Sequence, residues 1–203
     1  MTRFVDRGAI VAAYVGIGMA VTIGVSFLLV IPIEPIYWLL AVPAGLTIGY
    51  YANQRSNRGT GPRGRILSNG LYAGAVTAVT FALLLIVVKG LFFFADNGYP
   101  DFNRVDDDGN AIPPACQAGA DCVYQRYLAD GRGDALAEQG VTDAGSFTAF
   151  YWNQQLVTGG LLLGLTTVAG IGGAAIYLAS RPRDAVASAG EDAASAYGWG
   201  QPP

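Results

Sequence analysis

The stretch ILSNGLYAGAVTAVTFALLLIVVKGLFFF, residues 66–94, decides the fold class of this chain. Lys89 is the only charged side chain within it. An α-helix rises about 1.5 Å per residue, so about 20 apolar residues cross the roughly 30 Å of hydrocarbon in a bilayer. The stretch exceeds that length, and it therefore predicts a transmembrane helix.

Three further stretches, residues 8–31, 36–52 and 156–179, are similarly apolar and meet or approach the same length. The 203 residues are 52% hydrophobic and 13% charged, whereas an ordinary soluble domain carries about 25% charged residues. A charged side chain costs about 2.5–3.5 kcal/mol at the centre of a membrane helix, which explains the deficit. We expect an all-α integral membrane protein with four transmembrane helices.

Arginines and acidic residues fall on opposite sides of these predicted spans. Arginines occupy the segments before the first span, between the second and third, and after the fourth: Arg3, Arg7, Arg55, Arg58, Arg63, Arg65, Arg181 and Arg183. The segment 96–155 holds ten acidic residues against three arginines. Because arginines near span ends favour the cytoplasmic side, we expect both termini in the cytoplasm of a multi-pass protein of the cell membrane.

This topology divides the chain into four regions. Residues 1–95 hold the first three transmembrane helices with short connections, and residues 156–179 hold the fourth. Residues 96–155 form an acidic extracytoplasmic loop, in which residues 120–139 have helical character and rest on the helix ends. Residues 180–203 lack apolar periodicity and are expected to be a disordered cytoplasmic tail.

Small side chains recur at every fourth position in the spans and predict the faces on which helices pack. Residues four apart share a helix face, and small side chains there let two backbones approach closely. The partner is either another span of this chain or another protein. The predicted packing residues are Gly8, Ala12, Gly16, Ala20 and Gly24, then Gly70, Gly74, Ala78 and Ala82, then Gly160 and Gly164, with a shorter stripe of Ala41, Gly45 and Gly49.

Aromatic residues gather near the span ends, as amphipathic rings do at the level of the lipid headgroups. The alternative is that they are bulky core residues. The predicted outer belt is Tyr37, Trp38, Phe92, Phe93, Phe94, Tyr151 and Trp152, and the inner belt is Tyr50, Tyr51, Tyr72 and Tyr177.

Lys89 is the one charge inside a predicted span, and such charges are candidates for function. Its long stem can instead carry the ammonium group to the headgroups, which is the structural alternative. A functional Lys89 would pair with Glu34 or Asp96, or attract an anion. Pro43, inside the second span, predicts a kink, with Thr47 as a candidate donor to the freed carbonyl.

Two features of the outer loop suggest chemistry. Cys116 and Cys122, the only cysteines, lie on the side expected to be oxidising and predict a structural disulfide. Asp106, Asp108 and Asn110 form a candidate calcium site. Ala115 stands where an EF-hand loop would need glutamate, so a solvated turn is the alternative.

No histidine, paired carboxylates or metal-ligand cluster is found in the sequence, so we expect neither an enzyme nor a cofactor. The net charge of −3 disfavours a nucleic-acid partner. The expected partners are the lipid bilayer and other membrane protein subunits, or a second copy of the chain. The sequence predicts an accessory or structural subunit of a membrane assembly, with a small transporter or channel subunit as the alternative.

Overall fold

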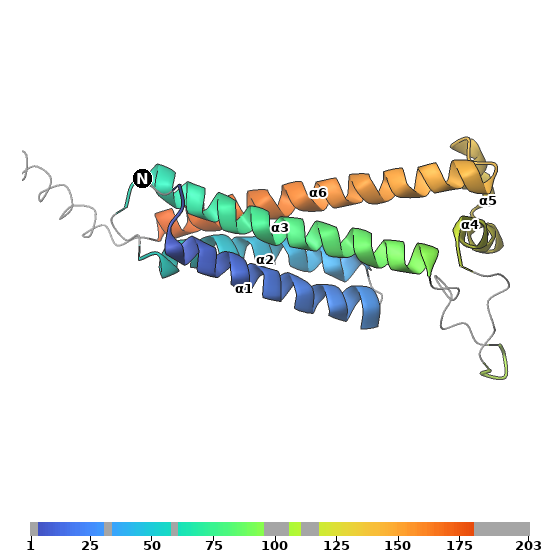
Figure 1. Cartoon of the computed structure of the whole chain (residues 1–203), viewed down its shortest axis with the longest axis horizontal. Coiled ribbons are helices and arrows are strands. Elements are labelled where there is room, and N and C mark those ends of the chain that lie inside the picture. The colour runs from blue at the N-terminus through green and yellow to red at the C-terminus, as the bar shows by residue number, and fades with distance from the viewer. Residues whose placement is uncertain (1–3, 31–33, 58–60, 96–105, 111–117, 181–203) are drawn as a thin grey trace, which may run out of the picture. The chain divides into compact units, whose positions relative to one another are not determined.

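The computed structural model describes residues 4–30, 34–57, 61–95, 106–110 and 118–180. These residues form helices and contain no strand (Figure 1). The elements in chain order are α1 (Arg7–Gly24), the π-helix η1 (Val25–Val30), α2 (Glu34–Arg55), α3 (Arg63–Phe94), α4 (Ala120–Ala129), α5 (Gly133–Glu138) and α6 (Ala144–Ala179).

Three helical segments are long and apolar enough to cross a membrane: Arg7–Leu29, Arg63–Phe94 and Ala144–Ala179. This confirms the helical class and supports a membrane location. The second predicted span is helical as α2, but it is not among the three, because prolines, glycines and a polar end dilute its apolar residues. The four-span topology therefore stays a prediction, as does the tail, which lies outside the described residues from 181 onward.

The helix α6, which contains the fourth predicted span, begins at Ala144, earlier than the predicted start at Leu156. Its start is fixed by Asp143, whose Oδ1 accepts a hydrogen bond from the backbone N–H of Ser146 at 2.8 Å. This is the usual capping arrangement at a helix N-terminus. The sequence-based boundary was late because the polar residues 153–155 interrupt the apolar run, although they lie within the helix. Residues 144–155 thus belong to α6 and not to a loop.

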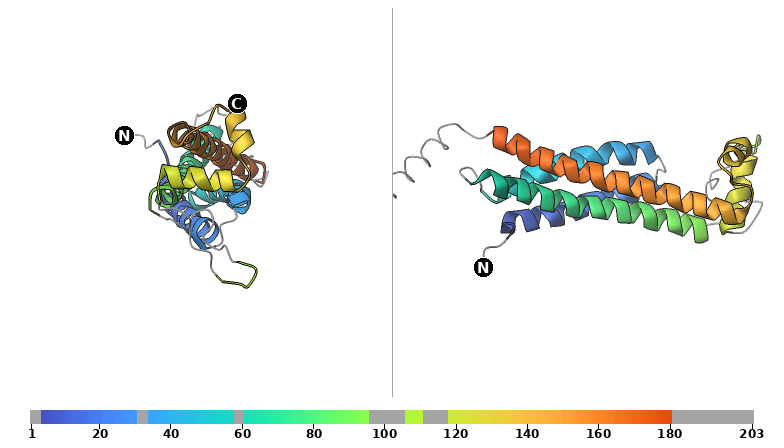
Figure 2. Two further views of the ribbon diagram at one scale, coloured as in Figure 1. Left: turned by 90° about the vertical axis from the view of Figure 1, so that its right-hand side faces the viewer. Right: turned by 90° about the horizontal axis from the view of Figure 1, so that it is seen from above.

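The chain divides into two compact units. The first contains α1, η1, α2, α3 as far as Ala82 and α6 from Leu162 onward; the second comprises Leu83–Leu161. In the first unit α1, α2 and the parts of α3 and α6 that belong to it lie side by side and alternate in direction (Figures 1 and 2). The start of α1, the end of α2 and the start of α3 meet at one end of this unit, and each of these helix termini is an arginine.

Glycines allow α2, α3 and α6 to touch through their backbones in the first unit. A methyl group added at Gly170 would lie 2.6 Å from the Cα of Gly74, and one at Gly45 would lie 2.5 Å from the carbonyl oxygen of Thr166. Nothing larger than hydrogen fits at these positions. The small residues predicted to pack on α1 and α3 are all buried: Gly8, Ala12, Gly16, Ala20, Gly24, Gly70, Gly74, Ala78 and Ala82.

The predicted packing residues of α6 do not pack against the described part of this chain, so a partner outside the chain stays a prediction. Gly160 and Gly164 are exposed, and a methyl group at either position would meet open space. Within the first unit the helix buries Gly170 and Gly173. Leu162 is buried and Gly164 follows it by two positions, so the two side chains point about 200° apart around a helix of 3.6 residues per turn.

The second unit has an aromatic and aliphatic core between the end of α3, α4, α5 and the start of α6. The rings of Phe93 and Tyr151 stack with centroids 4.7 Å apart, and both residues are buried. The predicted helical character of residues 120–139 is confirmed by α4 and α5. The buried residues of this core are Phe93, Val123, Tyr124, Leu136, Val141, Phe147 and Tyr151.

The aromatic-belt prediction is wrong for three residues, which are core residues instead. Phe93 and Tyr151 belong to the core of the second unit. In the first unit Tyr37 is fully buried, and its hydroxyl donates to the backbone oxygen of Phe81 at 2.6 Å. Period and end position cannot separate a belt from a core, because both place aromatic rings near helix ends.

The kink residue Pro43 is exposed within α2. Thr47 Oγ1 donates to the carbonyl oxygen of Pro43 itself at 2.8 Å. The carbonyl that proline leaves without its usual N–H donor is that of Leu39, four residues earlier. Thr47 therefore makes the ordinary hydrogen bond of a helical threonine to the preceding turn. It does not donate to the freed carbonyl of Leu39, contrary to the prediction from the sequence.

We predict that Gly170→Ala destabilises the protein by about 1–3 kcal/mol, the usual cost of overpacking a filled interior. Gly164→Ala is the matched control, because it meets open space and gains up to about 1 kcal/mol of helix propensity. Unfolding of both variants by a denaturing detergent, followed by circular dichroism, provides the measurement. Equal stability of the two variants would show that α3 and α6 do not touch at Gly170.

Candidate functional site

A network of buried amide groups lies at the arginine-bearing end of the first unit. Asn53 and Asn69 are both fully buried. Asn69 Nδ2 donates to Asp6 Oδ2 at 2.7 Å and to Asn53 Oδ1 at 3.2 Å, and the backbone N–H of Asp6 donates to Asn69 Oδ1 at 3.0 Å. Asn69 thus connects the start of α1 to the end of α2.

The network continues into the backbone and to an ion pair. Asn53 Nδ2 donates to the carbonyl oxygens of Gly49 and Ile66, both at 3.1 Å. Arg65 Nε lies 3.4 Å from Asp6 Oδ1, and Arg65 also donates to the carbonyl oxygen of Phe4 at 3.0 Å. The negative charge of Asp6, which is mostly buried, therefore has a guanidinium counter-charge.

This arrangement fixes how three helix ends meet. A buried polar group is costly unless it is hydrogen-bonded, and hydrogen bonds are stronger in the low dielectric of a protein interior. The network therefore penalises any sliding of α1, α2 or α3 that separates its members. The role of the network is therefore structural: it holds the ends of three helices in register.

The second predicted span ends just before Asn53, and the stretch 66–94 contains Asn69, but sequence reasoning missed the network. The available signal was periodicity: Ile66, Asn69 and Ala73 recur on one face of α3, and all three are fully buried. A polar residue on an otherwise apolar face needs a partner from a neighbouring helix. That partner lies in α2 and before α1, which the pattern of α3 alone does not reveal.

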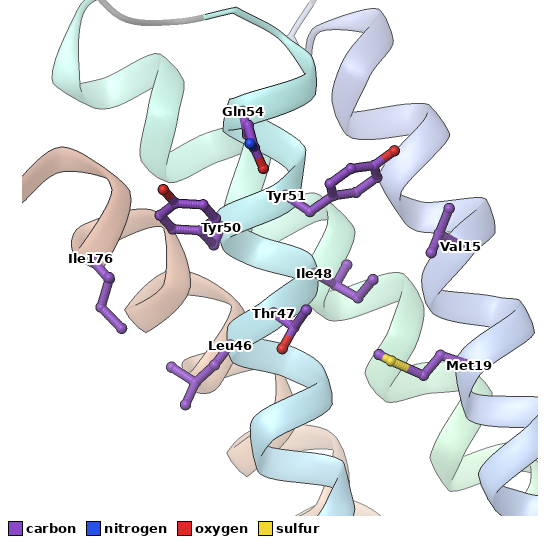
Figure 3. A pocket seen from close by; sticks show the side chains of 9 residues that line it. All are labelled: Val15, Met19, Leu46, Thr47, Ile48, Tyr50, Tyr51, Gln54 and Ile176. Atoms are coloured by element: carbon purple, nitrogen blue, oxygen red, sulfur yellow. The ribbon is translucent and has the colours of Figure 1, made fainter. Parts of the chain in front are cut away.

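Beside the network lies an open groove of about 500 Å³ across the surface of α2 (Figure 3). Its apolar lining comes from Val15 and Met19 of α1, Leu46 and Ile48 of α2, and Ile176 of α6. Its polar lining comes from α2 alone and consists of Thr47, Tyr50, Tyr51 and Gln54. In Figure 3, Gln54 and the two tyrosine hydroxyls lie toward one end, while Met19 and Leu46 lie toward the other.

Of the site residues predicted from the sequence, Lys89, Cys122 and the calcium candidate Asp106, Asp108 and Asn110 lie among the described residues. Lys89 is half-buried on α3 within the second unit. Cys122 is 3% exposed in α4 of that unit, whereas Cys116 lies outside the described residues. The disulfide between them stays a prediction.

The calcium candidate forms a tight turn held by Asp106. Asp106 Oδ1 accepts hydrogen bonds from the backbone N–H groups of Asn110 at 2.7 Å and Asp108 at 3.1 Å. The hydrogen bond from the Asn110 backbone is the main cause that lowers the pKa of Asp106 below its usual value. This carboxylate already has protein donors. Among the described residues no group of three or more acidic, histidine or cysteine side chains is arranged to hold a metal ion.

Comparison of the chain with protein-family models, with curated proteins and with solved structures finds no match.

We predict that Asn69→Ala destabilises the protein by about 1–3 kcal/mol, because it removes the buried hydrogen bonds that Asn69 makes with Asn53 and Asp6. Ser68→Ala is the matched control, since the Ser68 hydroxyl donates to the carbonyl oxygen of Gly64 in the preceding turn of its own helix, outside the network. Detergent-induced unfolding measures both. Loss of stability confined to Ser68→Ala, or absent in both variants, would contradict a role for the network.

Proposed function

We propose that this protein is a non-enzymatic, multi-pass membrane protein that acts as a helix-packing subunit of a membrane assembly. One observation carries the proposal: Gly164 on α6 faces open space. The predicted small residues of α1, α2 and α3 pack within the chain, so their partners are accounted for. Gly164 has the same residue type at the same spacing from Gly160, and it contacts no other helix among the described residues.

The surroundings of Gly164 suit a second helix. Leu165 is 50% exposed and Val168 is 65% exposed, and Val168 lies one turn after Gly164 on the same face. A glycine flanked by larger apolar residues forms a shallow depression along a helix. In lipid, helices associate by close packing and hydrogen bonding rather than by the hydrophobic effect, so such depressions favour association.

The proposal includes four transmembrane helices with both termini in the cytoplasm. α2 supports a fourth crossing because Ala41, Gly45 and Gly49 are buried in the first unit, where α2 runs beside three more apolar helices. The arginines at the meeting ends of α1, α2 and α3 support a common cytoplasmic side. The Cys116–Cys122 disulfide belongs to the opposite side.

We predict that the intact protein from cell membranes shows no free thiol before reduction and two after it. A protease site placed after Pro203 should be cut only when the protease has access to the cytoplasmic side. Thiol counting by mass spectrometry and protection of the tagged chain in sealed vesicles measure these two properties. Free thiols, or cleavage from the exterior, would contradict the disulfide or the orientation respectively.

We predict that Gly164→Leu weakens the assembly by about 1–3 kcal/mol, because added bulk separates closely packed backbones. Gly18→Leu is the matched control, since Gly18 on α1 also faces open space but lies on another helix. The full chain is extracted in mild detergent, and the mass of its complex is measured by light scattering across a dilution series.

The proposal expects the wild type and Gly18→Leu to remain in a complex at concentrations where Gly164→Leu falls to one copy of the chain. The outcome that overturns it is a wild-type protein that stays a single copy in membranes and detergent alike. Reconstitution in liposomes provides the companion measurement: solute flux carried by the lone chain would favour the transporter alternative.

A further inference from the structure

The groove on α2 is amphipathic along its length. Apolar residues from α1, α2 and α6 line it, and its polar groups gather toward the end of α2 (Figure 3). On a helix surface that faces lipid, an apolar groove alone needs no special occupant, because acyl chains fill any such depression. A polar end changes this, because it can recognise the headgroup of the lipid that lies there.

A second, polar pocket of about 370 Å³ continues the groove. It is lined by Tyr51, Gln54, Arg55 and Asn57, and it shares Tyr51 and Gln54 with the groove. Arg55 is exposed at the end of α2. The apolar groove therefore leads to the guanidinium group of Arg55, the hydroxyl of Tyr51 and the side-chain amides of Gln54 and Asn57.

The charge at this end of the first unit is positive. Arg7, Arg55 and Arg63 are exposed, whereas Arg65 pairs with Asp6. Among the described residues that line the two cavities, none is acidic. The carbonyl oxygens at the end of α2 carry partial negative charge, which disfavours an anion there, so Arg55 is the group that would make the site attractive to one.

We propose that the groove and the adjoining pocket bind one anionic glycerophospholipid. Its acyl chain lies along the apolar lining at Val15, Met19 and Ile176, and its phosphate accepts hydrogen bonds at Arg55 and Gln54. Basic pockets between membrane helices recognise anionic headgroups in this way, and a cavity of about 500 Å³ is within the usual size range of small-molecule sites. This inference rests on the membrane location in the proposed function.

The test compares two lipids with the same acyl chains, phosphatidylglycerol and phosphatidylcholine, on the full-length protein in detergent. Native mass spectrometry counts bound lipid across a titration. We expect phosphatidylglycerol to bind with a preference of roughly fivefold at low salt, the factor that one arginine near an anionic lipid supplies. The preference should fall toward one in Arg55→Gln.

Two matched controls separate the site from general surface effects. Arg63→Gln removes another exposed arginine that lines neither cavity, and it should keep the preference. Val15→Trp fills the groove and should lower the occupancy of both lipids, whereas Val21→Trp places the same bulk on an exposed part of α1 outside the groove and should not.

Equal binding of the two lipids, or equal loss of preference in Arg55→Gln and Arg63→Gln, would overturn the proposal. Displacement of phosphatidylglycerol by inorganic phosphate alone would also overturn it, because the acyl chain would then contribute nothing. A second copy of the chain or a companion protein that covers Arg55 in the isolated complex would likewise overturn it.

Failure of the lipid-binding proposal is distinguishable from failure of the proposed function. The assembly test depends on Gly164, which lines neither cavity, and it can fail while lipid preference persists. Extraction of the protein from cells without detergent would reject the membrane location, and both proposals with it.

Discussion

The close approach of three backbones around Gly170 is the constraint on which the first unit depends. At this point α6 meets α3 with Gly74 against Gly170, and α2 contributes Gly49 to the same contact. Lipid surrounds separated helices as favourably as helices surround each other, so association in a membrane requires contacts that lipid cannot match. Backbone surfaces in direct contact supply such dispersion energy. Each of the three glycines is therefore fixed by its neighbour, and none tolerates a larger side chain without movement of a helix.

The polar network adds direction to this packing. Glycine contacts alone define a face, but a helix can slide along a smooth face. Asn69 and Asn53 bond to each other and to specific backbone carbonyls, so their partners are reached in one register only. Asp6 and Arg65 extend the network to the polar end of the bundle, where a charge pair is less costly than at the membrane centre. The two kinds of contact explain why the arginine-bearing end combines exposed charge with buried amides.

The outer surface of the first unit carries the two features on which the proposals rest. Among the described residues, Gly164 and the apolar residues beside it form an exposed face of α6, and the groove across α2 is a second surface feature, which ends near Arg55. Both are positioned by the same buried contacts, since α2 and α6 are held together through Gly45 and Thr166. The proposed protein contact and the proposed lipid contact are therefore two consequences of one rigid helical framework, and they act through different residues.

The sequence by itself determined the helical class, the long apolar helices and the burial of the small residues on α1 and α3, because these follow from composition and from a period measured along one helix. Tertiary structure alone decided which face of α6 packs inward, that Tyr37, Phe93 and Tyr151 are core residues, and that Asn53 and Asn69 meet. The physical reason is that each of these outcomes depends on the rotation of one helix against another. A helix can present several chemically similar faces, such as Gly164 and Gly170, and only the shape of its neighbours selects between them.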